Sequence, residues 1–285
     1  MDRGRGGAVF ERIGAGLSRR WEVSDVLFET HTGFQNLLIG RTGQGVALFC
    51  DDERQSTEAS QLIYHEALMV PPMLLAGRRR RVLVIGSSEG VLSRIAADEG
   101  AEVDHVDIDR VAVRACAEHL PYGYTPEILK AAERGQGPIR VHYQDGWEFV
   151  ARSDGGYDLV LVDLPDEHPG SGEQYERLYS TEFLRRCASL LAPEGVVAGQ
   201  AGSAIKQRNG TLINAWRRFR EVFGTTVYYG SDEHGWAFLS GRLDEVPDPL
   251  AVMTERLGEL RYRPETIDAE ALRGNTVPPL SVRRS

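Results

Sequence analysis

Acidic side chains occur at the positions where a parallel α/β sheet binds a nucleoside. The first, Glu89, lies in the glycine turn Gly86–Gly90, between a short apolar run and a helical pattern. Asp107 and Asp109 end the next apolar run, about 20 residues further on, where a carboxylate often holds ribose hydroxyls. Asp145 follows a third run and precedes another helix. Successive strand ends of one sheet therefore each carry an acid.

The types of these residues predict the ligand. A carboxylate accepts two hydrogen bonds from a cis-diol, as Asp107 would from a ribose, and Asp145 would accept from an adenine amino group. Glu89 would disfavour a pyrophosphate at the helix start, because like charges repel, and would favour a cationic ligand. Together the acids predict an adenosine ligand without phosphate, most simply a sulfonium nucleoside. The alternative is that they are solvated acids at strand ends.

The elements that position these residues alternate between strand and helix. Val82–Ile85 is a β-branched run typical of a strand buried on both faces, and the helical pattern after it places Leu92 and Ile95 on one face. Tyr157–Asp163 is the clearest strand after the first. Because residues 79–240 keep this alternation, we predict an α/β fold with a mostly parallel sheet covered on both faces.

Other segments carry further signals. Helices are predicted over Glu58–Val70, which Pro71-Pro72 would end, and over Thr181–Leu191 and Thr211–Phe223. Strands are predicted at Val196–Gln200 and at an antiparallel pair, Val227–Tyr229 and Trp236–Ser240. The segment Asp166–Tyr179 is rich in Pro, Gly and acids, and we expect a mobile lid there.

The N-terminal part has a different character. Residues 1–20 contain five arginines and five glycines and are predicted to be a basic, flexible arm. From Trp21 the hydrophobic period changes to two, which predicts a small antiparallel β unit with strands at Val26–Thr30, Phe34–Ile39 and Gly45–Cys50. We therefore expect an arm over 1–20, a β unit over 21–57 and a Rossmann-like catalytic domain over 58–285.

The composition of the chain limits the partners and the compartment that we expect for the protein. The chain has 285 residues and a net charge of −9, which argues against a nucleic-acid groove as its main surface and fits a cationic substrate. Its three cysteines are widely spaced without a metal-ligand pattern, so we expect reduced thiols and no metal site. No apolar run approaches the roughly 18 residues that span a bilayer, and no signal peptide is evident. These features predict a cytoplasmic protein without a membrane partner.

Several motifs, in their order and spacing, resemble those of the polyamine aminopropyltransferases, of which spermidine synthase is the best known. The similarity runs from about Trp21 to the C-terminus. The matching motifs are Gly33–Asn36, Gln55–Glu58, Tyr64–Glu66, Val82–Gly90, Val106–Asp109, Gln144–Phe149, Tyr157–Asp166, Leu178–Phe183 and Gln200–Ser203. The resemblance implies a Rossmann-like sheet of the class I methyltransferase type with a small N-terminal antiparallel β unit. It also implies a homodimer.

The resemblance implies roles for individual residues. The co-substrate would be decarboxylated S-adenosylmethionine, which becomes methylthioadenosine, and no cofactor would stay bound. Asp107 would hold the ribose, Asp145 the adenine amino group, and Glu89 the amino group of the donor. The remaining nucleoside contacts would come from Gln35, Gly86 and Gly146.

On the acceptor side, the resemblance makes Asp163 the general base, with Tyr64 beside it. His65 and Asp166 would help to hold the di- or polyamine. A protonated amine has no lone pair, so a carboxylate within hydrogen-bond reach must take its proton before it attacks. The alternatives are a half-buried helix tyrosine at Tyr64 and turn-forming acids at Asp163 and Asp166.

The chain departs from the family pattern at several positions. Ser87 and Ser88 replace glycines of the loop, and Glu89 replaces an aspartate. Gln61 stands where an acid is usual, and residues 229–236 replace a proline-rich segment that helps to shape the acceptor site. Because of this replacement, the resemblance does not carry putrescine over as the acceptor.

Two other functions fit part of the pattern. The same scaffold could carry an S-adenosylmethionine-dependent amine methyltransferase. A donor that keeps its carboxylate would need a hydrogen-bond donor beside Glu89, and the loop offers only Ser87, Ser88 and backbone, which favours the decarboxylated donor. A non-catalytic nucleoside- or polyamine-binding module is the third interpretation, and the presence of both Asp163 and Tyr64 argues against it.

Overall fold

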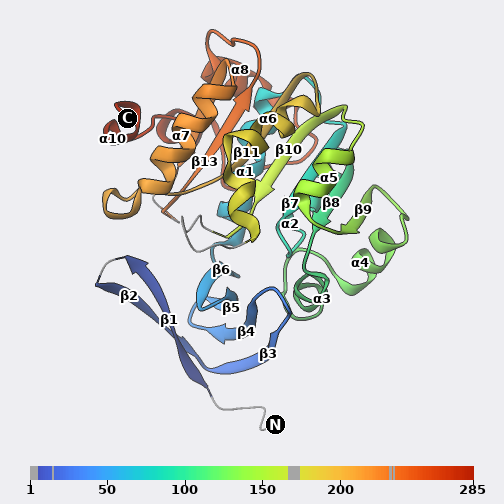
Figure 1. Ribbon diagram of the computed structural model, residues 1–285, viewed down its shortest axis with the longest axis vertical. Helices are drawn as coiled ribbons and strands as arrows, with labels where there is room; N and C mark the ends of the chain where they lie inside the picture. Colours follow the sequence, from blue (N-terminus) through green and yellow to red (C-terminus); the bar gives the residue numbers. More distant parts are fainter. Residues whose placement is uncertain (1–5, 15, 166–173, 231–232, 234) are drawn as a thin grey trace.

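The computed structural model describes residues 6–14, 16–165, 174–230, 233 and 235–285. A seven-stranded sheet crosses the body of the molecule in the order β12-β13-β11-β10-β7-β8-β9 (Figure 1). Its strands are β7 (Arg81–Gly86), β8 (Glu102–Asp107), β9 (Ile139–Tyr143), β10 (Tyr157–Asp163), β11 (Leu191–Ser203), β12 (Thr225–Gly230) and β13 (Trp236–Arg242). Within this sheet β13 alone runs antiparallel to its neighbours, β11 and β12. The predicted α/β fold with a mostly parallel, Rossmann-like sheet is confirmed.

Helices cover both faces of this sheet (Figure 1). One face packs against α1 (Gln61–Leu75), α2 (Val91–Glu99), α3 (Arg110–His119), α4 (Pro126–Glu133), α8 (Pro249–Arg256) and α9 (Ala269–Asn275). The other packs against α5 (Gly146–Arg152), α6 (Thr181–Ser189), α7 (Gly210–Val222) and α10 (Leu280–Arg283). Along β7, Val82 and Val84 belong to the first core and Leu83 and Ile85 to the second. Because strand side chains alternate, a strand covered on both faces is apolar at every position.

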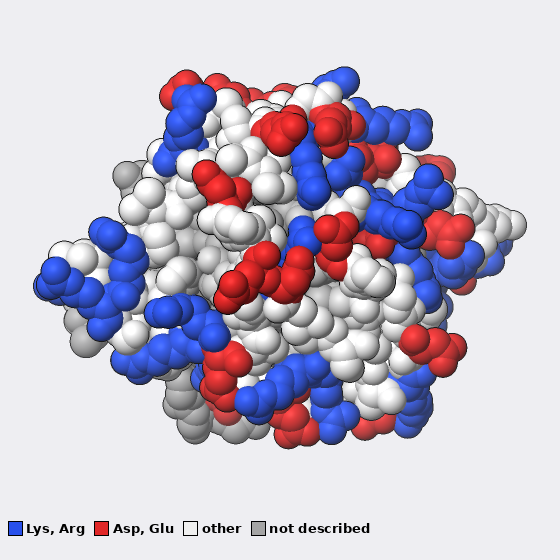
Figure 2. All heavy atoms as spheres, turned by 90° about the horizontal axis from the view of Figure 1, so that it is seen from above, with Lys and Arg blue, Asp and Glu red and all other residues white. Residues whose placement is uncertain are grey.

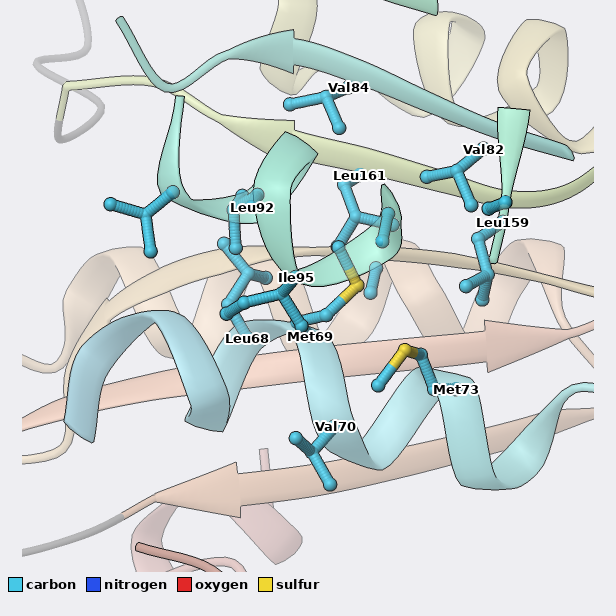
Figure 3. Close-up of a cluster of buried hydrophobic side chains, with 14 of the residues drawn as sticks. Leu68, Met69, Val70, Met73, Val82, Val84, Leu92, Ile95, Leu159 and Leu161 are labelled. Atoms are coloured by element: carbon cyan, nitrogen blue, oxygen red, sulfur yellow. The ribbon is translucent and has the colours of Figure 1, made fainter. Parts of the chain in front are cut away.

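Helix α1 differs from its predicted course. It begins at Gln61 and continues to Leu75, with Pro71 and Pro72 inside it rather than after its end. A proline inside a helix removes a backbone hydrogen bond and crowds the preceding turn. Here tertiary packing outweighs that cost, because every residue from His65 to Leu75 is buried. Figure 3 shows the methionines of α1 against side chains of α2, β7 and β10.

The small N-terminal sheet has four strands, one more than predicted. They are β3 (Asp25–His31), β4 (Asn36–Thr42), β5 (Gly45–Cys50) and β6 (Glu53–Thr57), in that order and all antiparallel. The strand missed from the sequence is β6, whose sequence Glu-Arg-Gln-Ser-Thr has no apolar residue. Its backbone pairs with β5, so its position depends on the sheet rather than on its own hydrophobic pattern.

The prediction of a flexible arm is wrong for most of the described residues before Trp21. Strands β1 (Gly7–Gly14) and β2 (Leu17–Val23) form an antiparallel hairpin that projects beside the four-stranded sheet (Figure 1). Val9, Trp21 and Val23 are buried against Ala47 and Phe49 of β5. The apolar residues of the hairpin are few and widely spaced along the sequence. They become buried only because β5 packs against the hairpin.

The remaining segments are short. Two predicted boundaries shift, because α6 ends at Ser189 and β11 begins at Leu191. Short 3₁₀ helices occur at η1 (Gln174–Tyr179), η2 (Lys206–Arg208) and η3 (Leu257–Glu259). The first eight residues of the predicted lid, 166–173, lie outside the described residues.

Among the described helices, none has the length and apolar character needed to cross a membrane.

The surface carries both signs of charge. The chain has 33 basic and 42 acidic side chains, not counting histidine. Seen from above, these side chains lie interspersed over most of the visible face (Figure 2). Such mixing of both signs on one face is usual for globular proteins.

Candidate active site

A cavity of about 580 Å³ lies between the carboxyl ends of the parallel strands and the four-stranded N-terminal sheet. We refer to it as the main cavity. Eight predicted site residues line it: Gln35, Tyr64, Gly86, Glu89, Asp107, Asp145, Gly146 and Asp163. His65 lies outside its wall, and Asp166 lies outside the described residues. The main cavity therefore gathers residues from distant parts of the sequence in one space.

Gly86 lets β7 and β10 end side by side. Its φ is 79°, in the left-handed region, and a Cβ at this position would lie 2.1 Å from the Asp163 carbonyl oxygen. The next residue, Ser87, donates its backbone N–H to the same carbonyl at 3.0 Å. A glycine is required here on both counts, since a side chain would be strained and would clash. The turn thus holds Glu89 and Asp163 in the same cavity.

Asp107 is a buried carboxylate at the end of β8. Its Oδ1 accepts the backbone N–H of Asp109 at 2.8 Å, and its Oδ2 accepts the Ser88 hydroxyl at 2.7 Å. Burial raises the pKa of the Asp107 carboxyl to about 7, and the two hydrogen bonds offset this only in part. Each carboxylate oxygen has two lone pairs, so both can still accept a hydroxyl from a ribose.

Asp109 connects the N-terminal sheet to the central one. It caps α3 by accepting the Ala112 N–H at 3.0 Å, and it accepts the Thr32 hydroxyl at 2.6 Å and the Gln35 side-chain amide at 3.0 Å. These bonds hold the turn between β3 and β4 against the strand end that carries Asp107. Gln35 is therefore positioned in the main cavity by Asp109, a role that sequence reasoning did not assign.

Both carboxylate oxygens of Asp145 have hydrogen-bond partners within the protein. Its Oδ1 caps α5 by accepting the backbone N–H groups of Trp147 and Glu148, at 2.8 and 3.2 Å. Its Oδ2 forms an ion pair with Arg177 at 2.7 Å. An adenine amino group would have to share Oδ2 with Arg177 or displace it. The sequence pattern did not indicate Arg177, because η1 reaches α5 only in the folded protein.

Asp163 and Tyr64 meet directly at the main cavity. The Tyr64 hydroxyl donates to Asp163 Oδ1 at 2.7 Å, and its ring packs edge-on against Phe238 with the ring centroids 4.9 Å apart. Burial raises the pKa of the Asp163 carboxyl in the ligand-free protein, a direction that the sequence could not establish. A carboxylate with a raised pKa is a better proton acceptor than an exposed one.

A second, smaller cavity adjoins the first. It measures about 40 Å³ and shares Glu53, Gln55, Tyr64 and Leu164 with the main cavity. We refer to it as the side cavity. Its other lining residues are Glu11, Arg12, Arg54, Ser56, Ser60, Gln61, Gln200, Arg208 and Trp236. Sequence reasoning singled out Gln61 and the segment that includes Trp236, but it missed Arg54, which β6 carries here.

Comparisons with known proteins agree with this geometry. A family model for the spermine/spermidine synthase domain matches residues 61–231. A curated polyamine aminopropyltransferase from Synechococcus sp. is 36% identical over 92% of this chain and 87% of its own length. Another, from Aeropyrum pernix, is 32% identical over 79% of this chain and 71% of its own length. The chain belongs to the spermine/spermidine synthase family.

Solved structures show that the fold of this family extends over the whole chain. A spermidine synthase crystallised with the transition-state analogue AdoDATO superposes with a TM-score of 0.84 at 19% identity, covering 99% of this chain and 96% of its own. Spermidine synthase from Thermotoga maritima superposes with a TM-score of 0.81 at 18% identity, covering 99% and 95%. At these identities the likeness concerns the fold.

Within this member of the spermine/spermidine synthase family, the Tyr64-His65-Glu66 motif divides its tasks. Tyr64 faces both cavities, whereas His65 is buried behind it, with Nδ1 2.6 Å from the Gln61 carbonyl oxygen. Glu66 is fully buried and accepts hydrogen bonds from the Tyr262 hydroxyl and from residues 265 and 266. His65 therefore contacts Tyr64 rather than the cavity wall, and Glu66 anchors the C-terminal segment.

The described residues hold no arrangement of three or more His, Cys, Asp or Glu side chains suited to a metal ion. The three cysteines are buried and unpaired.

Proposed function

We propose that this protein is a polyamine aminopropyltransferase of the spermidine synthase type. It moves the aminopropyl group of decarboxylated S-adenosylmethionine to an amine of the di- or polyamine class and releases methylthioadenosine. The observation that carries the proposal is the Asp163–Tyr64 pair, which faces the same cavity as the nucleoside acids Asp107 and Asp145. The name of the curated relatives and the analogue bound to the solved spermidine synthase support the same reaction.

The charge of the main cavity supports a cationic donor. Seven carboxylates line it, and neither lysine nor arginine is among its described lining residues. They are Asp51, Glu53, Glu89, Asp107, Asp109, Asp145 and Asp163. Carboxylates around a partly dehydrated cavity attract a sulfonium ion and an ammonium group and raise their local concentration. In this arrangement Asp107 binds the ribose, Asp145 the adenine, and Glu89 the ammonium group of the donor.

The step itself needs one base and good alignment. The Asp163 carboxylate accepts a proton from the acceptor ammonium, and the freed nitrogen lone pair attacks the propyl carbon next to sulfur. A carbon–nitrogen bond forms, the carbon–sulfur bond breaks, and its electron pair neutralises the sulfonium. The Tyr64 hydroxyl donates to Asp163 Oδ1 and so fixes the orientation of the carboxylate in the main cavity. Holding two reactants in line can supply about 7–11 kcal/mol of the barrier reduction.

One incubation tests this function against the alternatives. The protein is mixed with decarboxylated or intact S-adenosylmethionine and a panel of amines, and the products are analysed by mass spectrometry. Aminopropyl transfer adds about 57 Da to an amine, and methyl transfer about 14 Da. We expect the first increment with the decarboxylated donor and release of methylthioadenosine. A +14 Da product, or no transfer to any amine, would refute the proposal.

Two features of the family remain predictions for this chain. A homodimer is expected from the resemblance alone, and sedimentation of the purified protein would test it. A cytoplasmic location is expected from composition and from the buried, unpaired thiols, and cell fractionation would test it.

A further inference from the structure

The side cavity has an unusual charge for a polyamine site. Three arginines line it, Arg12, Arg54 and Arg208, whereas the main cavity has none among its described lining residues. Among the described lining residues of the side cavity, the acids are Glu11 and Glu53. Glu11 is already engaged, because its Oε2 accepts the Trp21 indole N–H at 2.8 Å and an Arg19 N–H at 3.1 Å. Among the described lining residues, a distal ammonium group entering this space would therefore meet more cations than acids.

The side cavity lies where the far end of an acceptor would go. Tyr64 and Gln55 line both cavities, and Tyr64 is hydrogen bonded to Asp163. An amine whose nitrogen reaches Asp163 would therefore extend past Tyr64 into the side cavity. In the ligand-free protein its volume of about 40 Å³ has room for roughly three water molecules, which is also the size of a small polar group.

Two residues of the side cavity have an enclosed polar atom without a hydrogen-bond partner, Arg54 at Nε and Gln61 at Oε1. Arg54 is the charged one of the two. Its guanidinium lies 5.8 Å from the ring centroids of both Trp21 and Trp236, so two indoles flank it. Its Nε is enclosed and has no hydrogen-bond partner. Within the described part of the chain, no carboxylate forms an ion pair with Arg54, although Glu11 is close enough to act on it electrostatically. A charge that is partly removed from water without a partner is costly, and an incoming anion would relieve that cost.

From this geometry we propose that the acceptor amine carries a carboxylate at the end away from its attacking nitrogen, and that Arg54 binds this carboxylate. The inference rests on the proposed function and specifies the acceptor within it. A guanidinium is planar and can donate two parallel hydrogen bonds to the two oxygens of a carboxylate. The two aromatic rings that flank Arg54 keep this group in one place. Arg208, whose guanidinium lies 5.1 Å from the Trp236 ring centroid, adds positive charge to the same cavity.

The test compares three acceptors that differ only at the far end. They are 1,4-diaminobutane, ornithine, which is the same diamine with a carboxylate beside one amine, and 4-aminobutanoate, in which a carboxylate replaces one aminomethyl group. The measurement is kcat/KM with decarboxylated S-adenosylmethionine. We expect the wild-type protein to use at least one carboxylate-bearing acceptor more than 10-fold better than 1,4-diaminobutane. The reverse preference would overturn the inference and leave the proposed function intact.

Variants of Arg54 separate binding from structure. In Arg54→Gln we expect kcat/KM for the preferred acceptor to fall roughly 10- to 100-fold, the usual effect of losing a hydrogen bond between charged groups. The value for 1,4-diaminobutane should stay the same or rise. Arg54→Lys keeps the positive charge but loses the planar pair of N–H donors. Its kcat/KM for the preferred acceptor should therefore lie between the values for the wild type and for Arg54→Gln. Arg152→Gln, a change at an exposed arginine that lines neither cavity, serves as the matched control.

Several outcomes with these variants would contradict the inference. An equal loss for all acceptors in Arg54→Gln, together with a lower melting temperature, would assign Arg54 a purely structural role between the two tryptophans. If Arg54→Gln does not fold, Arg54→Lys replaces it in the test. An acceptor preference in Arg54→Lys equal to that of the wild type would then refute the binding of the acceptor carboxylate by Arg54. A loss seen only with intact S-adenosylmethionine would assign Arg54 to the carboxylate of the donor. Absence of transfer to any amine would instead refute the proposed function, and the inference with it.

Discussion

Replacing Asp107 by asparagine should make the ligand-free protein more stable at alkaline pH, although it damages the nucleoside site. Burial raises the pKa of this carboxyl to about 7 in the folded protein, from an ordinary value of 3.8. Between these two values the unfolded chain has released the proton while the folded protein still holds it. Stability therefore falls as the pH rises through this range.

The size of the effect follows from the two pKa values. Between pH 5 and pH 8 the wild-type protein should lose roughly 2–3 kcal/mol of unfolding free energy through Asp107 alone, at about 1.4 kcal/mol per pH unit. An asparagine at this position has no charge to lose. Its side-chain oxygen can still accept the Asp109 N–H, and its amide can donate to the Ser88 oxygen. The variant should therefore lack this part of the pH dependence.

The assay is urea unfolding of the wild type and Asp107→Asn at pH 5 and pH 8. We expect the stability difference between variant and wild type to move in favour of the variant by roughly 2–3 kcal/mol from pH 5 to pH 8. Asp154→Asn, at an exposed aspartate, is the control for a general change in charge. Calorimetry with methylthioadenosine should show weaker binding only for Asp107→Asn. A stability difference that stays constant with pH would refute the reasoning about burial.

Three further variants test separate features of the site and its scaffold. Asp163→Asn should lower turnover by about 10²–10⁴-fold with little change in nucleoside binding, and higher pH should partly restore it by supplying free amine; turnover within a few-fold of wild type at neutral pH would exclude Asp163 as the base. Gly86→Ala should destabilise the fold and lower turnover, because a Cβ would lie 2.1 Å from the Asp163 carbonyl oxygen; an unchanged melting temperature and turnover would contradict that contact. Glu66→Gln should cost roughly 1–3 kcal/mol in urea unfolding, since a buried acceptor of several hydrogen bonds becomes partly a donor; a change as small as that of an exposed Glu148→Gln control would show that Glu66 does not anchor the C-terminal segment.

The central sheet and most of the residues that line the main cavity could be predicted from the sequence because their signals are local. Val82–Ile85 is apolar at every position since both its faces are covered, and a glycine turn follows it directly. Asp107 and Asp145 stand at strand ends, and parallel strands place their carboxyl ends at one edge of a sheet. The chain order of these motifs was therefore enough to predict that they share a cavity.

Other features depended on contacts between segments that are distant in the sequence. The prolines of α1 predict a helix end, yet burial of the helix between the sheet and its neighbours outweighs them. The hairpin β1–β2 and the polar strand β6 have weak patterns of their own, and they exist because β5 offers an apolar surface and a backbone edge for pairing.

The candidate site shows the same distinction between local signals and contacts made on folding. The residue types at 107, 145 and 163 determined the chemistry that the sequence could indicate, because a carboxylate acts as an acceptor or a base wherever it is placed. The raised pKa of Asp163 and the enclosed guanidinium of Arg54 arise only in the folded protein. Tertiary structure decides both, since dehydration and the distance to a counter-charge are properties of the space around a side chain rather than of its neighbours along the chain.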